Sequence, residues 1–332
     1  MAYDGKILSR AMQRYNEDKQ RRSAQQEAAR ARACREEPRL GQIRQTMQGT
    51  VGRVLAEAMS RGEDPMPALE ALRKENLGLQ QERAELLRSH GWPADLMEDK
   101  PRCILCGDTG FRQGRMCSCL QKYYAREQIE ELSRLLDVGS QSFESFVLEW
   151  YSCEVGQYGR SPRETMERNL SICRTFAQSF GSDSGNLLLF GAPGLGKTFL
   201  SACIARVVSE DGFSVVYDTA MRIFSRFEAA KFRAFDDLEA QEDTERYLRC
   251  DLLILDDLGT EMTTTMVQSA LYQIINGRLL SGRSTVISTN LMPAQLGERY
   301  GAQIRSRLEG EYQLLPFIGE DIRRLKRERG IS

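Results

Sequence analysis

The chain has 332 residues and carries 46 basic against 47 acidic side chains, so its formal net charge is −1. This length is long for a single domain, and we expect two or more units. The near-zero charge excludes a strongly basic nucleic-acid-binding protein, so any DNA contact has to come from local patches. The sequence shows neither a run of about 18 apolar residues nor a secretory signal, which predicts a cytoplasmic protein without a membrane partner.

The first part of the chain, residues 1–95, is rich in Arg, Glu, Gln and Ala and contains few β-branched residues. This composition, together with leucines at helical spacing, predicts a helical N-terminal region. Residues 6–35 are highly charged with few apolar positions. Such a segment fits either a long exposed helix or a partly disordered arm.

Four of the nine cysteines lie close together, and we expect a small zinc module over residues 96–125. The ligands would be Cys103, Cys106, Cys117 and Cys119. A C-x2-C pair, a gap and a C-x-C pair place thiolates on tight turns, which suits a closed tetrahedral Zn²⁺ site with a structural role. Four reduced thiols in a loop are one alternative, and a redox pair is another, although no thioredoxin-like pattern surrounds it. His90, the only histidine, is at best a reserve ligand.

Strand and helix signals alternate over residues 136–332, which predicts a three-layer α/β domain with a mostly parallel sheet. We expect strands at 186–190, 213–217, 251–255 and 284–289, and helices at 196–209, 219–231, 238–249 and 264–280. Ligands of such sheets bind at the carboxyl ends of the strands. The motifs described next fall at these ends.

The expected strand 186–190 runs directly into the pattern G-x-x-x-x-G-K-[ST], which binds nucleotide phosphates. Glycines leave room for successive backbone N–H groups to point at phosphate oxygens. Lys197 suits the β and γ phosphates, and Thr198 can take one position around Mg²⁺. The sequence therefore predicts an ATP and Mg²⁺ site that includes Gly191, Ala192, Pro193, Gly194, Leu195, Gly196, Lys197 and Thr198.

A second apolar strand ends in two adjacent carboxylates, Asp256 and Asp257. Asp256 is placed to hold Mg²⁺, because a hard cation between phosphates takes oxygen ligands. We expect Asp257 to polarise the attacking water, with Glu261 as a competing candidate for the base. The expected strand 284–289 ends in Asn290, whose amide could orient the water or touch the γ phosphate. A simple turn asparagine is the alternative.

Two arginines, Arg305 and Arg307, fall on a short expected helix. A planar guanidinium from this helix could neutralise transition-state charge on a γ phosphate bound by an adjacent subunit. Surface arginines are the ordinary alternative. Basic residues in the segment 222–233 could line a path for single-stranded DNA, with a charged solvated helix as the competing interpretation.

Together these motifs resemble the AAA+ ATPases, and within them the helicase-loader branch typified by DnaC and DnaI, in the IstB-like ATP-binding superfamily. The resemblance covers residues 140–328, and its markers are Gly191 to Thr198, Asp256 to Glu261, Ser288 to Leu291, Ser306 to Leu308 and Gly319 to Arg323. It implies that Asn290 is the sensor asparagine, Arg307 the arginine finger and Arg323 a second sensor. It also implies that Phe143 or Phe146 lies near the adenine. Gln303 stands where relatives often carry an arginine.

The resemblance also implies a function. A loader of this kind hydrolyses ATP, binds a replicative hexameric helicase through its N-terminal region, binds single-stranded DNA and forms a homo-oligomer on ATP or DNA. A helical region and a four-cysteine cluster ahead of the core favour this interpretation. Two alternatives stay open. One is an IstB-like transposition helper ATPase, and the other is a zinc-dependent adaptor in which bound nucleotide is only structural.

Overall fold

The computed structural model describes residues 3–47, 66–135, 141–155, 159–232 and 238–330. The chain forms two compact units. Residues 13–117 make up one of them, here called the helical unit, and residues 1–12 together with 118–332 make up the other, here called the sheet unit. The boundaries fall after Met12 and after Cys117, whereas the composition suggested boundaries near residues 95 and 125.

The helical unit is built from helices and one small hairpin. Helix α1 (Gly5–Glu36) runs from the sheet unit into it, residues 38–47 are also helical, and α3 (Met66–Ser89) follows. The antiparallel hairpin consists of β1 (Phe111–Arg112) and β2 (Arg115–Met116). The helical character expected for the first 95 residues is confirmed where the structure describes them. Residues 48–65 of that region lie outside the described residues.

Arg30 anchors the segment after α3 to helix α1. Its side chain is only 4% exposed, yet its Nε donates to the carbonyl oxygen of Leu96 at 2.8 Å, and a terminal nitrogen pairs with Asp99. Because the guanidinium finds acceptors, the cost of burying it is compensated. The apolar cluster of the unit contains Ala33, Leu40, Leu87 and Met97.

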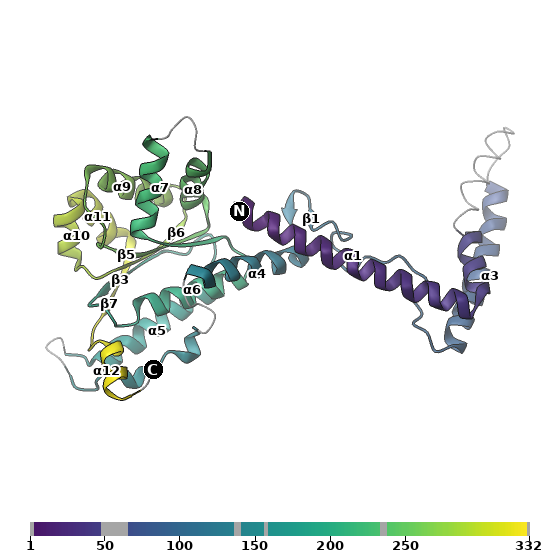
Figure 1. The fold of residues 1–332 in the computed structure, drawn as a ribbon, viewed down its shortest axis with the longest axis horizontal. Helices are drawn as coiled ribbons and strands as arrows, with labels where there is room; N and C mark the ends of the chain where they lie inside the picture. The colour runs from purple at the N-terminus through teal and green to yellow at the C-terminus, as the bar shows by residue number, and fades with distance from the viewer. Residues whose placement is uncertain (1–2, 48–65, 136–140, 156–158, 233–237, 331–332) are drawn as a thin grey trace. The chain divides into compact units, whose positions relative to one another are not determined.

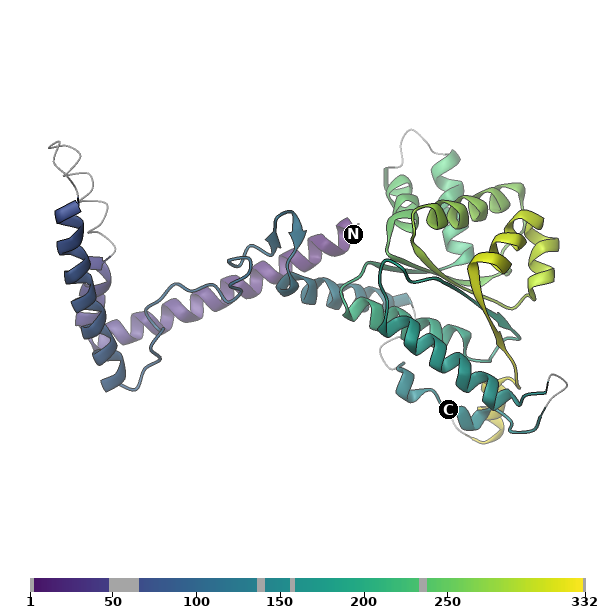
Figure 2. The ribbon, with the colours of Figure 1, turned by 180° about the vertical axis from the view of Figure 1, so that it is seen from behind.

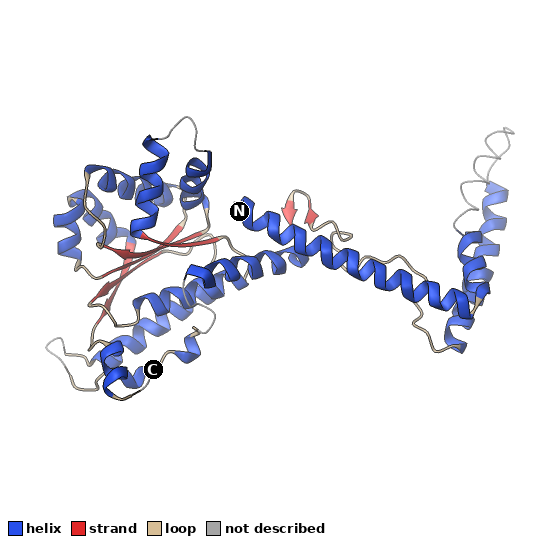
Figure 3. Cartoon of the chain, in the orientation of Figure 1, coloured by secondary structure: helices blue, strands red, loops and turns tan. Residues whose placement is uncertain are grey.

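The sheet unit contains a five-stranded parallel sheet, whose strands are the red arrows of this unit in Figure 3. They are β3 (Asn186–Gly191), β4 (Val215–Thr219), β5 (Leu252–Leu258), β6 (Ser284–Thr289) and β7 (Tyr312–Phe317). Their order across the sheet is β4-β5-β6-β3-β7, and each neighbouring pair is parallel. Strand β6 therefore lies between β3, which leads into the phosphate loop, and β5, which carries the aspartate pair.

Helices cover both faces of this sheet (Figures 1 and 2). One face carries α4 (Ser118–Leu135), α5 (Pro162–Gln178) and α6 (Lys197–Glu210), and the other carries α7 (Ala220–Phe232), α8 (Leu238–Arg249), α9 (Thr265–Leu280), α10 (Pro293–Tyr300) and α11 (Ala302–Glu311). Two 3-10 helices, η2 (Phe143–Ser145) and η3 (Leu148–Trp150), and helix α12 (Ile322–Glu328) also belong to the unit. Among the described residues, no helix is both long enough and apolar enough to span a membrane.

The sequence of β3 explains the two helical layers. Successive side chains of a strand point to opposite faces. Leu187 and Leu189 accordingly pack in the apolar cluster with α5 and α6, while Leu188 and Phe190 pack in the cluster with α7 and α9. A strand that is apolar on both sides is typical of a parallel sheet covered on both faces. The three-layer α/β fold expected from the sequence is confirmed.

The first turn of α1 belongs to the sheet unit. The Asp4 carboxylate accepts from the backbone N–H groups of Lys6 and Ile7 at 2.9 and 3.0 Å, which caps the helix. The same carboxylate pairs with Arg246 of α8. The Asp4 N–H donates to the Tyr124 hydroxyl of α4 at 2.9 Å. These contacts hold the turn against both α4 and α8.

Candidate nucleotide-binding site

The loop between β3 and α6 requires its glycines. Gly191, Gly194 and Gly196 have φ values of 142°, 76° and 89°, which residues with a side chain rarely adopt. A Cβ on Gly191 would lie 2.1 Å from the carbonyl oxygen of Phe317, and one on Gly194 would lie 2.0 Å from Oδ1 of Asp321. The loop is therefore bare of side chains at these points, so its backbone N–H groups can approach a polyanion at the start of α6.

Lys197 is held over this loop. Its Nζ donates to the carbonyl oxygens of Gly191 and Ala192 at 2.7 Å each, and the side chain is buried. Burial lowers the pKa of Lys197 to about 8, although the carboxylates of Asp257 and Asp256 act in the opposite direction. An ammonium group has three N–H donors. It can therefore reach phosphate oxygens placed in the loop as well as the two carbonyl groups.

The lysine-threonine pair and the aspartate strand meet at one point. The Thr198 Oγ1 atom lies 3.2 Å from Oδ2 of Asp256. Asp256 is 3% exposed, and its carboxylate also accepts hydrogen bonds from the hydroxyl groups of Tyr217, at 2.7 Å, and Ser288. A hydroxyl and a carboxylate oxygen are donors that Mg²⁺ takes in proteins. The donor set thus fits a magnesium ion held by Thr198 and Asp256.

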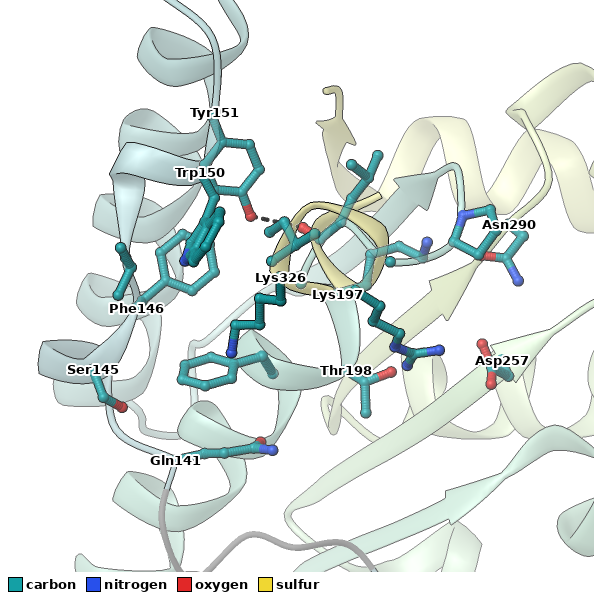
Figure 4. Close-up of a pocket in the computed structure, with 18 residues that line it drawn as sticks. Gln141, Ser145, Phe146, Trp150, Tyr151, Lys197, Thr198, Asp257, Asn290 and Lys326 are labelled. Carbon is teal, nitrogen blue, oxygen red and sulfur yellow. Dashed lines mark hydrogen bonds between the residues drawn. The ribbon is translucent and has the colours of Figure 1, made fainter. Parts of the chain in front are cut away.

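Asp257 lines a cavity beside the phosphate loop, here called the nucleotide cavity (Figure 4). Its backbone φ is 55°, an uncommon value of the kind that clusters at functional sites. The pairing of β5 with β6 is irregular between Leu255 and Leu258, and the Asp257 N–H donates to the Ser288 hydroxyl at 3.0 Å. Burial and the neighbouring Asp256 raise the pKa of Asp257. A raised pKa makes the carboxylate a better proton acceptor, as a general base requires.

Asn290 and Arg323 line the same cavity from two other elements. Asn290 follows β6 and lies on the same side of the cavity as Asp257 in Figure 4. Arg323 comes from α12, which rests on the phosphate loop because the Ile322 N–H donates to the Gly194 carbonyl at 3.0 Å. Both residues that the resemblance identified as sensors therefore reach the cavity.

Glu261 does not take part in this arrangement. It is 6% exposed, and its carboxylate accepts from the Gly259 N–H at 3.0 Å and from the Tyr300 hydroxyl. It is not among the residues that line the cavity. The expectation that Glu261 competes with Asp257 for the role of base is therefore corrected, because the protein's own donors occupy its oxygen atoms outside the cavity.

The cavity has a volume of about 370 Å³ and extends from the phosphate loop to an aromatic end. Phe146, Trp150 and Tyr151 line that end. Phe143, the other candidate for contact with adenine, is buried in the apolar core instead. The Tyr151 hydroxyl donates to the carbonyl of Leu195 in the loop at 2.9 Å, the dashed line in Figure 4. A polar end and an apolar end suit the phosphates and the base of a nucleotide.

Several residues of the site were not predicted from the sequence. Tyr217 and Ser288 reach Asp256 from the strands on either side of β5, and their alternation along expected strands is a signal that could have found them. Trp150 and Lys326 line the cavity from two short helices. No pattern in the sequence indicates where such short elements pack.

Arg305 and Arg307 do not line the cavity of their own chain. The Arg307 guanidinium lies over the Tyr272 ring, 5.6 Å from its centroid, whereas Arg305 pairs with Glu309 at 2.8 Å. Gln303 is exposed on the same helix. An arginine of this helix that acts on a γ phosphate would therefore act on a neighbouring copy.

The four clustered cysteines come together in space. All four sulfur atoms lie within 4.8 Å of one another, and they belong to Cys103, Cys106, Cys117 and Cys119. The Asp108 carboxylate shapes their loop by accepting from the N–H groups of Arg102 and Cys103 at 3.0 and 2.9 Å. Four thiolates are a donor set of structural zinc sites, so the cluster fits Zn²⁺. His90 is outside the cluster and stacks on Trp92.

Comparisons with known proteins extend these observations. Residues 162–306 match a family model described as IstB-like ATP binding protein. The chain is 34% identical over 135 residues to the uncharacterized protein YdaV of Escherichia coli. The aligned segment covers 39% of this chain and 53% of YdaV. It is 30% identical over 112 residues to a protein of Sinorhizobium fredii described as an insertion sequence ATP-binding protein, which covers 34% of this chain and 36% of that protein.

Helicase loaders also match. The chain is 27% identical over 139 residues to the replicative helicase loader DnaC of Escherichia coli, which covers 42% of this chain and 56% of DnaC. The match to a crystal structure of the DnaC helicase loader covers 55% of this chain and 98% of the DnaC chain. The sequence identity of this match is 20% and its TM-score is 0.45. The matched segments span between 36% and 56% of the length of these three relatives. Residues 162–306 of this chain are therefore similar to IstB-like ATP-binding proteins, and a segment of similar length is similar to DnaC.

Proposed function

We propose that this protein is an ATPase that loads a replicative hexameric helicase onto single-stranded DNA. The observation that carries the proposal is the meeting of Thr198 and Asp256, whose oxygen atoms lie 3.2 Å apart, in a chain similar to DnaC. A phosphate loop and a carboxylate that meet in this way can hold a triphosphate and its magnesium ion together. The ATP-bound protein and the protein after phosphate release would then be the two states of a conformational switch.

Hydrolysis is assigned to residues around the cavity. Thr198 and Asp256 would hold Mg²⁺, which would neutralise negative charge on the phosphates. Lys197 donates to phosphate oxygens as well as to its loop carbonyl groups, and Asp257 takes the proton of the attacking water. Asn290 orients that water or the γ phosphate from the end of β6.

A neighbouring copy completes the site in this proposal. None of the described residues that line the cavity comes from α11. Arg307 is the better candidate for a finger, because Arg305 is engaged with Glu309 while Arg307 lies over an aromatic ring. ATP would therefore favour a homo-oligomer in which Arg307 of one copy reaches the phosphates of the next, and hydrolysis would weaken that contact.

The binding of single-stranded DNA is assigned to helix α7 of the sheet unit. Arg222 and Arg226 are exposed on this helix, and Arg222 pairs with Asp218 at 3.3 Å. Arg233, at the end of the basic segment, lies outside the described residues. Basic side chains along a helix can follow a phosphate backbone, and such binding weakens steeply with salt.

The binding of the helicase is assigned to the helical unit, which carries Cys103, Cys106 and Cys117 of the cysteine cluster. Zinc bound by four thiolates leaves no open position for catalysis. Zinc would therefore brace the loop that Asp108 organises, and the unit would serve as a contact surface.

A transposition helper ATPase is the second candidate. It is favoured by the match of residues 162–306 to the IstB-like family model and by the 30% identity to the insertion sequence ATP-binding protein. Such a helper would bind a transposase and duplex DNA instead of a helicase and a single strand. Both candidates use the same nucleotide site, so the partner distinguishes them.

The test compares the 332-residue chain with its Lys197→Ala variant. Each is incubated with ATP, the replicative helicase of its host and closed circular single-stranded DNA coated with single-strand-binding protein. Unwinding of an annealed strand then reports the loaded helicase. We expect loading by the wild-type chain and none by the variant. Capture of a transposase without any helicase would instead establish the second candidate.

Steady-state ATP hydrolysis separates both candidates from an adaptor with structural nucleotide. We expect turnover that rises with single-stranded DNA and is lost in Asp256→Asn. A chain that binds ATP but shows neither stimulation nor that loss would be an adaptor.

A further inference from the structure

The nucleotide cavity is lined by one side-chain amide, on the side of Ser145 in Figure 4, that has no assigned role. Gln141 lines the cavity, and its Oε1 atom is buried without a hydrogen-bond partner among the described residues. Figure 4 shows Gln141 on the other side of the cavity from Asp257 and Asn290. A buried acceptor that meets no donor destabilises the protein. The atom therefore points to a donor supplied by the ligand.

The local backbone fixes the position of Gln141. The next residue, Ser142, caps η2, because its hydroxyl accepts from the Ser145 N–H at 3.3 Å and its own N–H donates to the Ser145 hydroxyl at 3.0 Å. A reciprocal pair of this kind sets the path of the chain into the helix. Phe146 follows, and its ring stacks on Tyr151 with the centroids 5.8 Å apart. One short segment thus presents both the amide and an aromatic wall.

The phosphate loop sets the direction in which a nucleotide lies. Phosphates belong at the loop and the start of α6, so the base extends toward the aromatic end. That end adjoins the loop directly, because a Cβ on Gly196 would lie 3.0 Å from the Phe146 ring. Aromatic rings pack on the face of a base, which leaves its edge for polar groups. Lys326, another polar side chain of the cavity, can only donate, whereas Gln141 offers an acceptor that has no hydrogen-bond partner among the described residues.

We propose that Gln141 selects adenine over guanine, an inference that rests on the proposed ATPase function. Its Oε1 accepts from the 6-amino group, and its Nε2 donates to N7. A glutamine amide makes this pair with adenine, whereas guanine and hypoxanthine present two acceptors, O6 and N7, on the same edge. A site built to bond a substrate N–H group rejects an analogue that lacks it, because the buried partner then stays unpaired.

The test is a double-mutant cycle between the protein and the nucleotide. Dissociation constants of the full chain are measured by competition with ATP and with inosine triphosphate, which carries an oxygen in place of the 6-amino group. The wild-type chain should prefer ATP by about tenfold or more, and Gln141→Leu should remove most of this preference by weakening ATP binding. Gln141→Met is a second variant in case leucine disturbs η2. Gln273→Leu, at an exposed position on α9, is the matched control and should keep the preference.

An equal preference for ATP in the wild-type chain and in both Gln141 variants would overturn the inference, since another group would then read the base. 7-deaza-ATP lacks the N7 acceptor and should bind the wild-type chain more weakly than ATP does. Equal binding of the two would overturn the N7 contact. The proposed function fails in a different way, namely if the wild-type chain binds neither nucleotide.

Discussion

Nucleotide affinity should fall above pH 8 because of the lysine in the phosphate loop. Burial lowers the pKa of Lys197 to about 8 in the nucleotide-free chain, against an ordinary value of 10.5. The phosphates of a bound nucleotide favour the charged form and raise this pKa again. Between the two pKa values binding therefore takes up a proton, so affinity falls as the pH rises. Well below pH 8 the lysine is charged in both states and contributes no pH dependence.

The size of the effect follows from linkage. A group that must be charged in the complex, and whose pKa is about 8 in the free chain, lowers the affinity by a factor of 1 + 10^(pH − 8). Relative to the plateau at low pH, the loss is about twofold at pH 8 and about tenfold at pH 9.

The assay is the dissociation constant of ATP from about pH 6.5 to about pH 9.5, at constant ionic strength and constant free Mg²⁺. The matched control is Lys197→Arg, which keeps the positive charge but does not titrate in this range. This variant should bind ATP more weakly and without the decline. The reasoning is refuted if the arginine variant loses affinity as steeply as the wild-type chain, or if the wild-type affinity stays constant up to pH 9.

Tyr217→Phe removes the 2.7 Å hydrogen bond to Asp256, so the Mg²⁺ concentration for half-maximal ATP binding should rise about tenfold; an unchanged titration would show that the tyrosine does not orient the carboxylate. Cys106→Ser should lower the zinc content, measured by atomic absorption, from about one ion per chain toward zero. Cys153→Ser alters an exposed cysteine outside the cluster and should not change it. Gly194→Ala should lower the melting temperature and abolish ATP binding, because the new Cβ would lie 2.0 Å from Asp321; a cost above about 1 kcal/mol is expected. Gly185→Ala, with nothing within 4 Å of its Cβ, should retain ATP binding, and loss in both variants would contradict this explanation.

The chemistry of the phosphate loop could be predicted because one continuous segment supplies it. From Gly191 to Thr198, bare backbone and two side chains are enough, and the structure adds their distances. The meeting of this loop with Asp256 was also predictable, because both follow parallel strands whose carboxyl ends share one edge. The alternation of strand and helix signals along residues 136–332 predicted the sheet and its helical layers in the same way.

What the sequence could not give depends on contacts between distant segments. Glu261 has a suitable spacing for a base, but its carboxylate is bound by the hydroxyl of Tyr300, from a helix that only tertiary packing places there. Trp150 and Lys326 reach the cavity from short elements, for which the same holds. The division into units has a similar cause. A single ion pair such as that of Asp4 with Arg246 leaves no local signature in the sequence.

Asp4 pairs with Arg246, so the start of the chain belongs to the sheet unit. The chain leaves this unit after Met12 and returns to it at Ser118, and the helical unit is therefore an insertion in the sheet unit. Two chain connections, and not a single linker, join the unit proposed to bind the helicase to the unit proposed to bind ATP. Deleting the first twelve residues would therefore not be a harmless trimming of a tail. It would cut one crossing and take a carboxylate partner from a guanidinium group that is largely sheltered from water.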